Sequence, residues 1–267
     1  MAGSEVNESP VAAVVFNDTR VDRHHGCLRV MEAIEELSAR NGMRIIHRSP
    51  AHHRWMDDPE TLAAVDRAQL LIVNGEGTIH HDREAGRRLI EVGAYARFRG
   101  IPAALINTGW EANGLELQEL VRDFSLVSVR DSVSATELQK AGVACRVVPD
   151  LSLYLEAHYF GKEKSSVIGC IDCVNRFTAL EIDRLCRAIE GRTLSIHFPQ
   201  PGLQGYLRFI RQGVAKSDFA SPATLANLVL MRHKIHSNST EDTLRFLEQL
   251  SRLRLLVSGR FHACTLA

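Results

Sequence analysis

Short apolar runs of strand length alternate with helical segments along the first 150 residues, and this alternation constrains the fold more than any other feature. The predicted strands are residues 11–16, 43–47, 69–73, 101–106, 124–129 and 144–148. The predicted helices between them are residues 28–39, 59–67, 83–98, 115–122 and 131–140. Strands that are apolar on both faces and alternate with helices indicate a mostly parallel, doubly wound α/β sheet with right-handed crossovers.

The same pattern starts again after about residue 160, beyond a polar linker at residues 161–165. The predicted strands of this second part are residues 167–171, 193–197 and 253–257. Its predicted helices are residues 178–189, 223–230 and 240–252. We therefore expect two Rossmann-like domains, residues 1–158 and 159–267, that face each other across a cleft. The chain stops soon after its last predicted strand, so we expect the second domain to be incomplete at its C-terminus.

The balance of charges argues against nucleic acid as a partner. The chain has 32 Lys and Arg residues and 32 Asp and Glu residues, so no bulk positive charge would attract phosphate backbones. Residues 1–10 are polar and acidic, and no segment reaches the roughly 18–20 consecutive apolar residues that span a bilayer. We expect a cytoplasmic protein.

The C-terminal segment places two chemically informative residues directly after a predicted strand. The apolar run breaks at Ser258 and Gly259, and Arg260 and His262 follow at the start of a predicted helix. Ligands of open α/β sheets bind beyond the carboxyl ends of the strands, where helix N-termini favour anions. A fixed cation and a titratable imidazole at this position suit a donor molecule that carries carboxylate or phosphate.

The loop after the first predicted strand is polar and opens a helix. It contains Asn17 and the adjacent pair His24 and His25. This loop could cradle an anion or place a general acid or base. A surface turn with a helix cap is the alternative interpretation.

The loop after the third predicted strand combines glycines with an acid. Gly75 and Gly77 flank Glu76, so the backbone could approach a ligand closely while the carboxylate points into the cleft. The dinucleotide fingerprint GxGxxG is incomplete here, which argues against NAD. His80 and His81 follow, but adjacent histidines rarely bind one ion without further ligands at helical spacing, so we expect no metal.

Two further strand ends carry charged residues. Arg130 follows the fifth predicted strand and is a candidate anion clamp, whereas Asp131 or Ser132 can cap the next helix. Asp150 follows the last predicted strand of the first domain, where we expect it at the mouth of the cleft. A purely structural carboxylate is the other interpretation of Asp150.

The cysteines and one basic segment carry weaker signals. Cys170 and Cys173 have zinc-like spacing without a second such pair, which favours reduced, mostly buried thiols over half a zinc site or a redox pair. Residues 205–211 mix basic and apolar side chains and could touch a lipid-linked acceptor, although a lid or core helix is the simpler interpretation.

Four segments together resemble the polysaccharide pyruvyl transferase family. They are residues 71–78, residues 128–134 with Leu138 and 141–143, residues 148–152, and residues 257–263. The resemblance implies a fold similar to the two-domain GT-B glycosyltransferases, with no metal or other cofactor. It also implies transfer of pyruvate from phosphoenolpyruvate onto two sugar hydroxyls as a cyclic ketal in cell-surface polysaccharide. The partners would be this small-molecule donor and a glycan acceptor, lipid-linked in one interpretation, with at most peripheral contact with the inner membrane.

The resemblance also implies roles for individual residues. Arg260 and His262 match the donor-binding Arg-x-His motif of the family, and Arg130 matches its Arg-Asp element. Two loops depart from the family pattern, because Asn17 to Arg20 with His24 to Gly26 replace a glycine-rich first loop and Glu76 stands in the third-strand turn.

Three interpretations of the chemistry follow. For pyruvyl transfer, Arg260 and Arg130 would bind carboxylate and phosphate, His262 or a strand-end histidine would protonate the methylene carbon, and Asp150 or Glu76 would deprotonate the hydroxyls. Glu76 and Asp150 also resemble the acidic pair of retaining transferases that use a CMP-activated Kdo-like sugar acid. A non-catalytic glycan- or nucleotide-binding module is the third.

Overall fold

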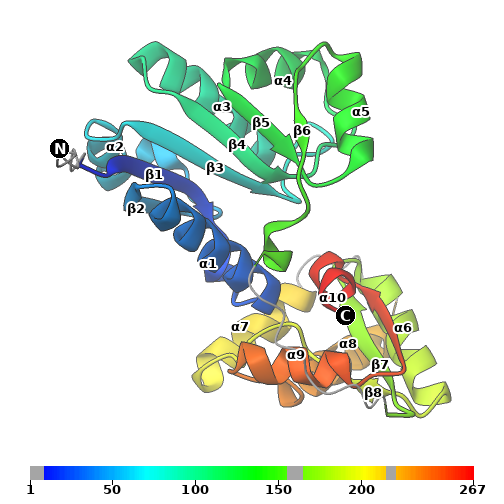
Figure 1. The fold of residues 1–267 in the computed structure, drawn as a ribbon. Helices are drawn as coiled ribbons and strands as arrows, with labels where there is room; N and C mark the ends of the chain where they lie inside the picture. The colour runs from blue at the N-terminus through cyan, green and yellow to red at the C-terminus, as the bar shows by residue number, and fades with distance from the viewer. Residues whose placement is uncertain (1–8, 155–164, 215–220) are drawn as a thin grey trace, which may run out of the picture. The chain divides into compact units, whose positions relative to one another are not determined.

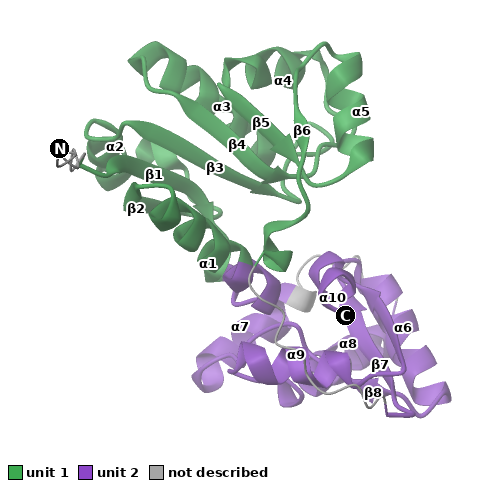
Figure 2. Ribbon diagram, viewed as in Figure 1, with its two compact units in different colours: residues 1–21, 30–154 green, residues 22–29, 155–267 purple. Residues whose placement is uncertain are grey.

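The structure is a computed structural model that describes residues 9–154, 165–214 and 221–267. The chain forms two compact units (Figure 2). Unit 1 consists of Met1–Val21 and Val30–Tyr154, and unit 2 consists of Asp22–Arg29 and Leu155–Ala267. Most of the predicted polar linker, residues 161–164, lies outside the described residues.

Unit 1 contains a six-stranded parallel sheet (Figure 1). Its strands are β1 (Val11–Asp18), β2 (Met43–Pro50), β3 (Leu70–Glu76), β4 (Ala103–Thr108), β5 (Leu126–Val129) and β6 (Arg146–Val147). Their order in the sheet is β2-β1-β3-β4-β5-β6, which confirms the predicted parallel α/β architecture. From β1 the chain runs to β2 at one edge of the sheet, and from β3 onward it runs strand by strand toward the other edge. The direction therefore switches between β1 and β3, and such a switch point is where open α/β sheets bind ligands.

Helices α1 (His25–Arg40), α2 (Pro59–Val65), α3 (Glu84–Arg99), α4 (Leu115–Leu120) and α5 (Ser132–Lys140) connect these strands. Local sequence explains several of their ends. Asp58 accepts a hydrogen bond from the backbone N–H of Glu60 and so caps α2, whose first residue is Pro59. Helix α3 ends at Gly100, which has the left-handed φ of 66° that glycine adopts without strain.

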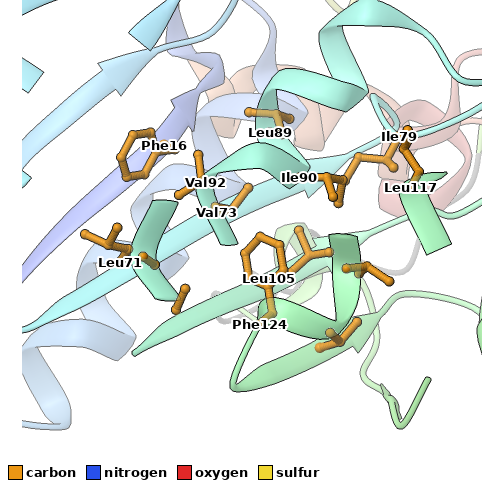
Figure 3. Close-up of a cluster of buried hydrophobic side chains, with 14 of the residues drawn as sticks. Phe16, Leu71, Val73, Ile79, Leu89, Ile90, Val92, Leu105, Leu117 and Phe124 are labelled. Carbon is orange, nitrogen blue, oxygen red and sulfur yellow. The ribbon is translucent and has the colours of Figure 1, made fainter. Parts of the chain in front are cut away.

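Alternate side chains of the central strands pack on opposite faces of the sheet, as the two-residue period of a strand requires. Ala13 and Val15 of β1 join a cluster with Val30, Met31 and Ile34 of α1. The intervening residues Val14 and Phe16 join a larger cluster with residues of β3–β5 and of α2–α5. Figure 3 shows part of this larger cluster, which includes Phe16, Leu71, Val73, Ile79, Leu89, Ile90, Val92, Leu105, Leu117 and Phe124. Both faces of β1 are therefore buried.

Unit 2 contains a three-stranded parallel sheet with the order β8-β7-β9. Its strands are β7 (Ile168–Cys173), β8 (Arg192–Thr193) and β9 (Leu255–Gly259). Its helices are α6 (Arg176–Ala188), α7 (Gly202–Val214), α8 (Pro222–Ser237), α9 (Thr243–Ser251) and α10 (Phe261–Leu266). Among the described residues, no helix combines the length and apolar character needed to span a membrane.

The predicted strand at residues 193–197 is wrong beyond Thr193. The carbonyl of Ile196 accepts the backbone N–H of His25, and Phe198 donates its backbone N–H to the carbonyl of Arg23. These groups therefore pair with the segment Asp22–Arg29 and do not extend β8. The same hydrogen bonds explain why this early segment belongs to unit 2.

Candidate functional site

The C-terminal ends of β1 and β3 meet in a buried polar network of unit 1. Thr19 Oγ1 donates a hydrogen bond of 2.5 Å to Glu76 Oε1, and Asn74 Nδ2 donates one of 3.1 Å to the same oxygen. Asn17 Nδ2 donates a hydrogen bond of 2.6 Å to the carbonyl of Asn74. The structure thus brings together the two predicted site residues Asn17 and Glu76. Thr19 was not singled out from the sequence, where nothing distinguishes it from an ordinary turn threonine.

Three adjacent strands of unit 1 end in strained backbone. Asn17, Glu76 and Asn107 have φ angles of 67°, 42° and 53°, in the left-handed region that favours glycine. Such a backbone conformation costs about 1–3 kcal/mol and persists only where surrounding interactions offset that cost, and strain of this kind clusters at functional sites. Here the network supplies that support, because Asn107 Oδ1 accepts the N–H of Leu151 and Asn107 Nδ2 donates to Asn74 Oδ1.

The two glycines beside Glu76 have different neighbours. A Cβ added to Gly75 would lie 2.3 Å from the side chain of Thr108, so this glycine allows β3 to approach the end of β4. A Cβ added to Gly77 would lie 3.3 Å from Nη2 of Arg130. The space next to Gly77 therefore holds a guanidinium group of the same unit.

Arg130 and Asp150 lie together in unit 1. Arg130 Nη1 donates a hydrogen bond of 3.2 Å to Asp150 Oδ2, and Asp150 Oδ1 accepts the backbone N–H of Ser152. The side chain of Asp150 is 2% exposed and that of Arg130 is 11% exposed. In this conformation the candidate anion clamp is paired with the candidate base. Asp131 caps α5 by accepting the N–H of Ser134, which confirms the capping interpretation.

His80 and His81 lie in a loop of unit 1 and contact each other, with their Nδ1 atoms 3.1 Å apart. The backbone N–H of His81 donates to the carbonyl of Glu111. Within the described part of the chain, neither histidine belongs to a group of three or more potential metal ligands.

In unit 2, Arg260 is held in place by a buried carboxylate. It follows β9 and precedes α10, and its Nε and Nη2 donate parallel hydrogen bonds of 2.8 Å to the two oxygens of Asp172. Burial raises the pKa of Asp172, but the hydrogen bonds and charge of Arg260 lower it by more, so this pKa lies below its ordinary value. The pair therefore stays ionised at neutral pH.

A pocket of about 230 Å³ in unit 2 lies next to this pair. Its lining includes Asp172 at the end of β7, Arg176 at the start of α6, and Arg232 of α8. Arg232 Nη1 lies 3.8 Å from Asp172 Oδ2, and its guanidinium stacks on the ring of Phe209 at 4.6 Å. Two guanidinium groups, those of Arg260 and Arg232, thus lie on one carboxylate, and Arg176 adds a third positive charge to the lining of the pocket. The positive surplus suits an anion.

Sequence reasoning missed Asp172 and Arg232. An acid inside the apolar run of β7 was a usable signal for Asp172, because buried carboxylates need a cation. Arg232 lies in the middle of α8 with no motif around it.

His24 and His262 also lie together in unit 2. Their ring centres are 5.4 Å apart, and both side chains are buried. His24 Nδ1 accepts the backbone N–H groups of Gly26 and Cys27 at 3.1 and 3.4 Å. This confirms the helix-cap interpretation of the loop, although the cap is buried and does not lie on the surface. Burial holds the pKa of His24 well below its usual value, and the nearby charges of His197 and His262 add to this effect.

The side chain of His25 is buried against an aromatic ring of unit 2. Its ring stacks on Phe246 at 4.5 Å with an interplanar angle of 10°, and its Nδ1 lies 2.9 Å from Thr243 Oγ1 in a hydrogen bond. The side chain is fully buried. His25 is therefore a core histidine of unit 2.

Comparison with known proteins places the chain in a family. No curated protein sequence matches it in a direct comparison. A family model described as "Polysaccharide pyruvyl transferase" matches residues 14–267, which is nearly the whole chain and includes the four segments that carried the resemblance. The chain therefore belongs to the polysaccharide pyruvyl transferase family, a family of transferases with a role in polysaccharide biosynthesis.

Proposed function

We propose that the protein transfers the pyruvyl group of phosphoenolpyruvate onto two hydroxyl groups of a sugar as a cyclic ketal, and that unit 2 binds this donor. Membership of the family supports the reaction class. The observation that carries the assignment of the donor to unit 2 is the set of arginines at this pocket: Arg260 and Arg232 lie on Asp172, and Arg176 lines the pocket beside them.

The positive charges of these arginines complement the negative charges of phosphoenolpyruvate. The donor carries a carboxylate and a phosphate, which together need more positive charge than one arginine supplies. Arg260 is held rigidly by Asp172, while Arg176 and Arg232 line the adjacent pocket. Rigidly held guanidinium groups bind carboxylate and phosphate oxygens through paired hydrogen bonds with little loss of side-chain entropy.

The proposed chemistry balances without a further reactant. Protonation of the methylene carbon leaves a cation-like centre at the neighbouring carbon, which the first sugar hydroxyl attacks with loss of its proton. Phosphate then leaves, and the second hydroxyl attacks the same carbon and releases its proton. One of the two hydroxyl protons replaces the proton given to the methylene carbon, and the other leaves with phosphate.

His262 is the proposed proton donor to the methylene carbon. It is two residues beyond Arg260 and is buried beside His24. The base that deprotonates the hydroxyls is proposed to be Asp150 or Glu76 of unit 1. Each carboxylate accepts hydrogen bonds in the present conformation, but catalytic hydrogen bonds often form only once substrate is bound.

Thermal unfolding with and without ligand tests the donor. A ligand at about 100 times its Kd adds about 2.7 kcal/mol of stability, which raises the midpoint by a few degrees. We expect phosphoenolpyruvate to raise the midpoint and cytidine monophosphate to leave it unchanged. Stabilisation by the cytidine nucleotide alone would overturn the proposal in favour of a sugar transferase, and no response to either ligand would favour a binding module with another ligand.

Arg260→Lys sharpens this test, because a lysine cannot form the two parallel hydrogen bonds to Asp172. We expect the variant to fold, by circular dichroism, and to lose the response to phosphoenolpyruvate. Arg252→Lys is the matched control, because Arg252 lies in the same unit in an exposed pair with Glu248. An unchanged response in Arg260→Lys would contradict the proposed donor site.

A further inference from the structure

Three potential metal ligands converge inside unit 2. One ligand atom each from His24, Cys27 and His262 lies within 4.8 Å of the other two, and all three residues are buried. Among the residues that the structure describes, this is the one group of three or more His, Cys, Asp or Glu side chains with such geometry.

The sequence builds this group from two helix N-termini. His24 is the residue before α1, and Cys27 lies three positions later in its first turn, a spacing that places two side chains on one side of a helix. His262 comes from the first turn of α10. It lies directly over Gly26, where an added Cβ would be 2.3 Å from the Cβ and Cγ of His262. Because Gly26 has no side chain, His262 can approach His24 and Cys27.

The ligand types select a class of metal. Two imidazoles and a thiolate suit zinc and its neighbours in the first transition series, whereas calcium and magnesium require oxygen ligands. Bonds of about 2.0–2.1 Å to nitrogen and about 2.3 Å to sulfur put two tetrahedral nitrogen ligands and one sulfur ligand roughly 3.3–3.6 Å apart. Side-chain movements of about 1 Å would therefore close the observed group around an ion.

A fourth polar atom lies beside the group. The ring of His197 is 5.3 Å from that of His24, and its Nε2 is buried without a hydrogen-bond partner in the described part of the chain. Such an atom carries an uncompensated desolvation cost, which an ion or its bound water would relieve.

Two effects oppose binding. Arg260 is close enough for its charge to act on His24, so it would repel a cation, but its bidentate partner Asp172 and the thiolate of Cys27 would offset this repulsion. His24 Nδ1 now caps α1, and a neutral imidazole has a single acceptor nitrogen. A metal would therefore replace the cap, which is a weak interaction compared with coordination.

We propose that His24, Cys27 and His262 bind one transition-metal ion of the zinc class, with a fourth position open to water or an anion. This proposal departs from the sequence-based expectation of a protein without a metal, and it does not depend on the proposed function. One consequence does rest on that function: since His262 is also the proposed proton donor, a bound ion would compete with catalysis.

The test uses the full chain, reduced and freed of metal, titrated with Co²⁺ as a spectroscopic probe. We expect one equivalent to bind with a thiolate-to-cobalt charge-transfer absorption in the near ultraviolet, and one equivalent of Zn²⁺ to abolish it. Cys27→Ser should lose this absorption. Cys264→Ser is the matched control and should keep it, because Cys264 is exposed and only two residues beyond His262.

His24→Asn separates metal binding from folding, because asparagine is among the best helix-capping residues but is not an imidazole. We expect this variant to keep its circular dichroism and to bind Co²⁺ more than about 100-fold more weakly. The proposal is overturned if the wild-type protein shows no charge-transfer absorption, if Cys264→Ser loses it in place of Cys27→Ser, or if His24→Asn binds like the wild type. Phosphoenolpyruvate binding measured with a chelator present tests the proposed function separately.

Discussion

Gly26→Ala is the substitution that most directly tests the packing of the site in unit 2. Gly26 is the second residue of α1, and an alanine Cβ would lie 2.3 Å from the Cβ and Cγ of His262. Both atoms are close to the backbone of α10, so the overlap cannot be relieved by rotating the end of a flexible side chain. His262 and its helix would have to move by about 1 Å to restore ordinary contact.

The expected change in stability is the sum of two opposing effects. Alanine in a helix is favoured over glycine by about 0.5–1 kcal/mol, whereas overpacking costs about 1–3 kcal/mol. We therefore expect Gly26→Ala to reduce the free energy of unfolding by about 1–2 kcal/mol. Gly205→Ala is the matched control in α7 of the same unit. Its added Cβ would meet its nearest atoms at 3.5 Å, an ordinary contact, so we expect a gain of up to about 1 kcal/mol.

The assay can separate the two units, because both tryptophans of the chain, Trp55 and Trp110, are buried in unit 1. Tryptophan fluorescence during urea unfolding reports unit 1, whereas far-ultraviolet circular dichroism reports both units. Gly26→Ala should lower the midpoint seen by circular dichroism more than the fluorescence midpoint, because α1 also packs in unit 1, and it should weaken the response to phosphoenolpyruvate. If Gly26→Ala is as stable as Gly205→Ala and responds fully to the ligand, then His262 does not pack against Gly26.

Three further predictions concern buried side chains that can ionise. Asp172→Ala leaves the buried guanidinium of Arg260 without its carboxylate and should destabilise unit 2 by about 3–5 kcal/mol in urea unfolding; a loss below about 1 kcal/mol would mean that water replaces the carboxylate. Burial lowers the pKa of His25 and His197 to about 4, below the value near 6.5 of an unfolded chain. The unfolded state therefore takes up protons first, and the free energy of unfolding falls as the pH drops from about 6.5 to 4. The loss is at most about 3 kcal/mol for each histidine. Urea unfolding followed by circular dichroism at a series of pH values measures this loss. A free energy of unfolding that does not change with pH would show that the two rings are hydrated. Glu76→Gln keeps an oxygen that can accept both hydrogen bonds, so its fluorescence midpoint in urea should match that of the wild type. A loss of more than about 2 kcal/mol in the free energy of unfolding would show that the network needs the negative charge.

The sheet of unit 1 was predictable because its signals are local. Residues 11–16 and 70–73 are apolar on both faces, and such runs are typical of central parallel strands. The observed strands extend further, to Asp18 and Glu76, across polar residues that the hydropathy pattern excludes. Their pairing depends on neighbouring strands and on the buried polar network, which a local pattern does not contain.

The candidate site was only partly predictable. Strand-end reasoning identified Arg260 and His262, and both lie in the unit that we propose binds the donor. Their surroundings depend on residues far away in sequence, since Asp172 precedes Arg260 by 88 positions. The sequence does not indicate the pairing of Arg130 with Asp150 for a similar reason: each residue follows a different strand, and only the folded sheet places them in contact.

The segment Asp22–Arg29 has a consequence for how the protein can be made and dissected. Arg23 donates a side-chain hydrogen bond to the carbonyl of Pro199, 176 positions later in the chain. During synthesis this segment leaves the ribosome long before its partners, so unit 2 is a discontinuous body that can close only at a late stage. A fragment that starts at residue 155 would lack His24, Gly26 and Cys27, and its failure to fold or bind would say nothing about the intact protein.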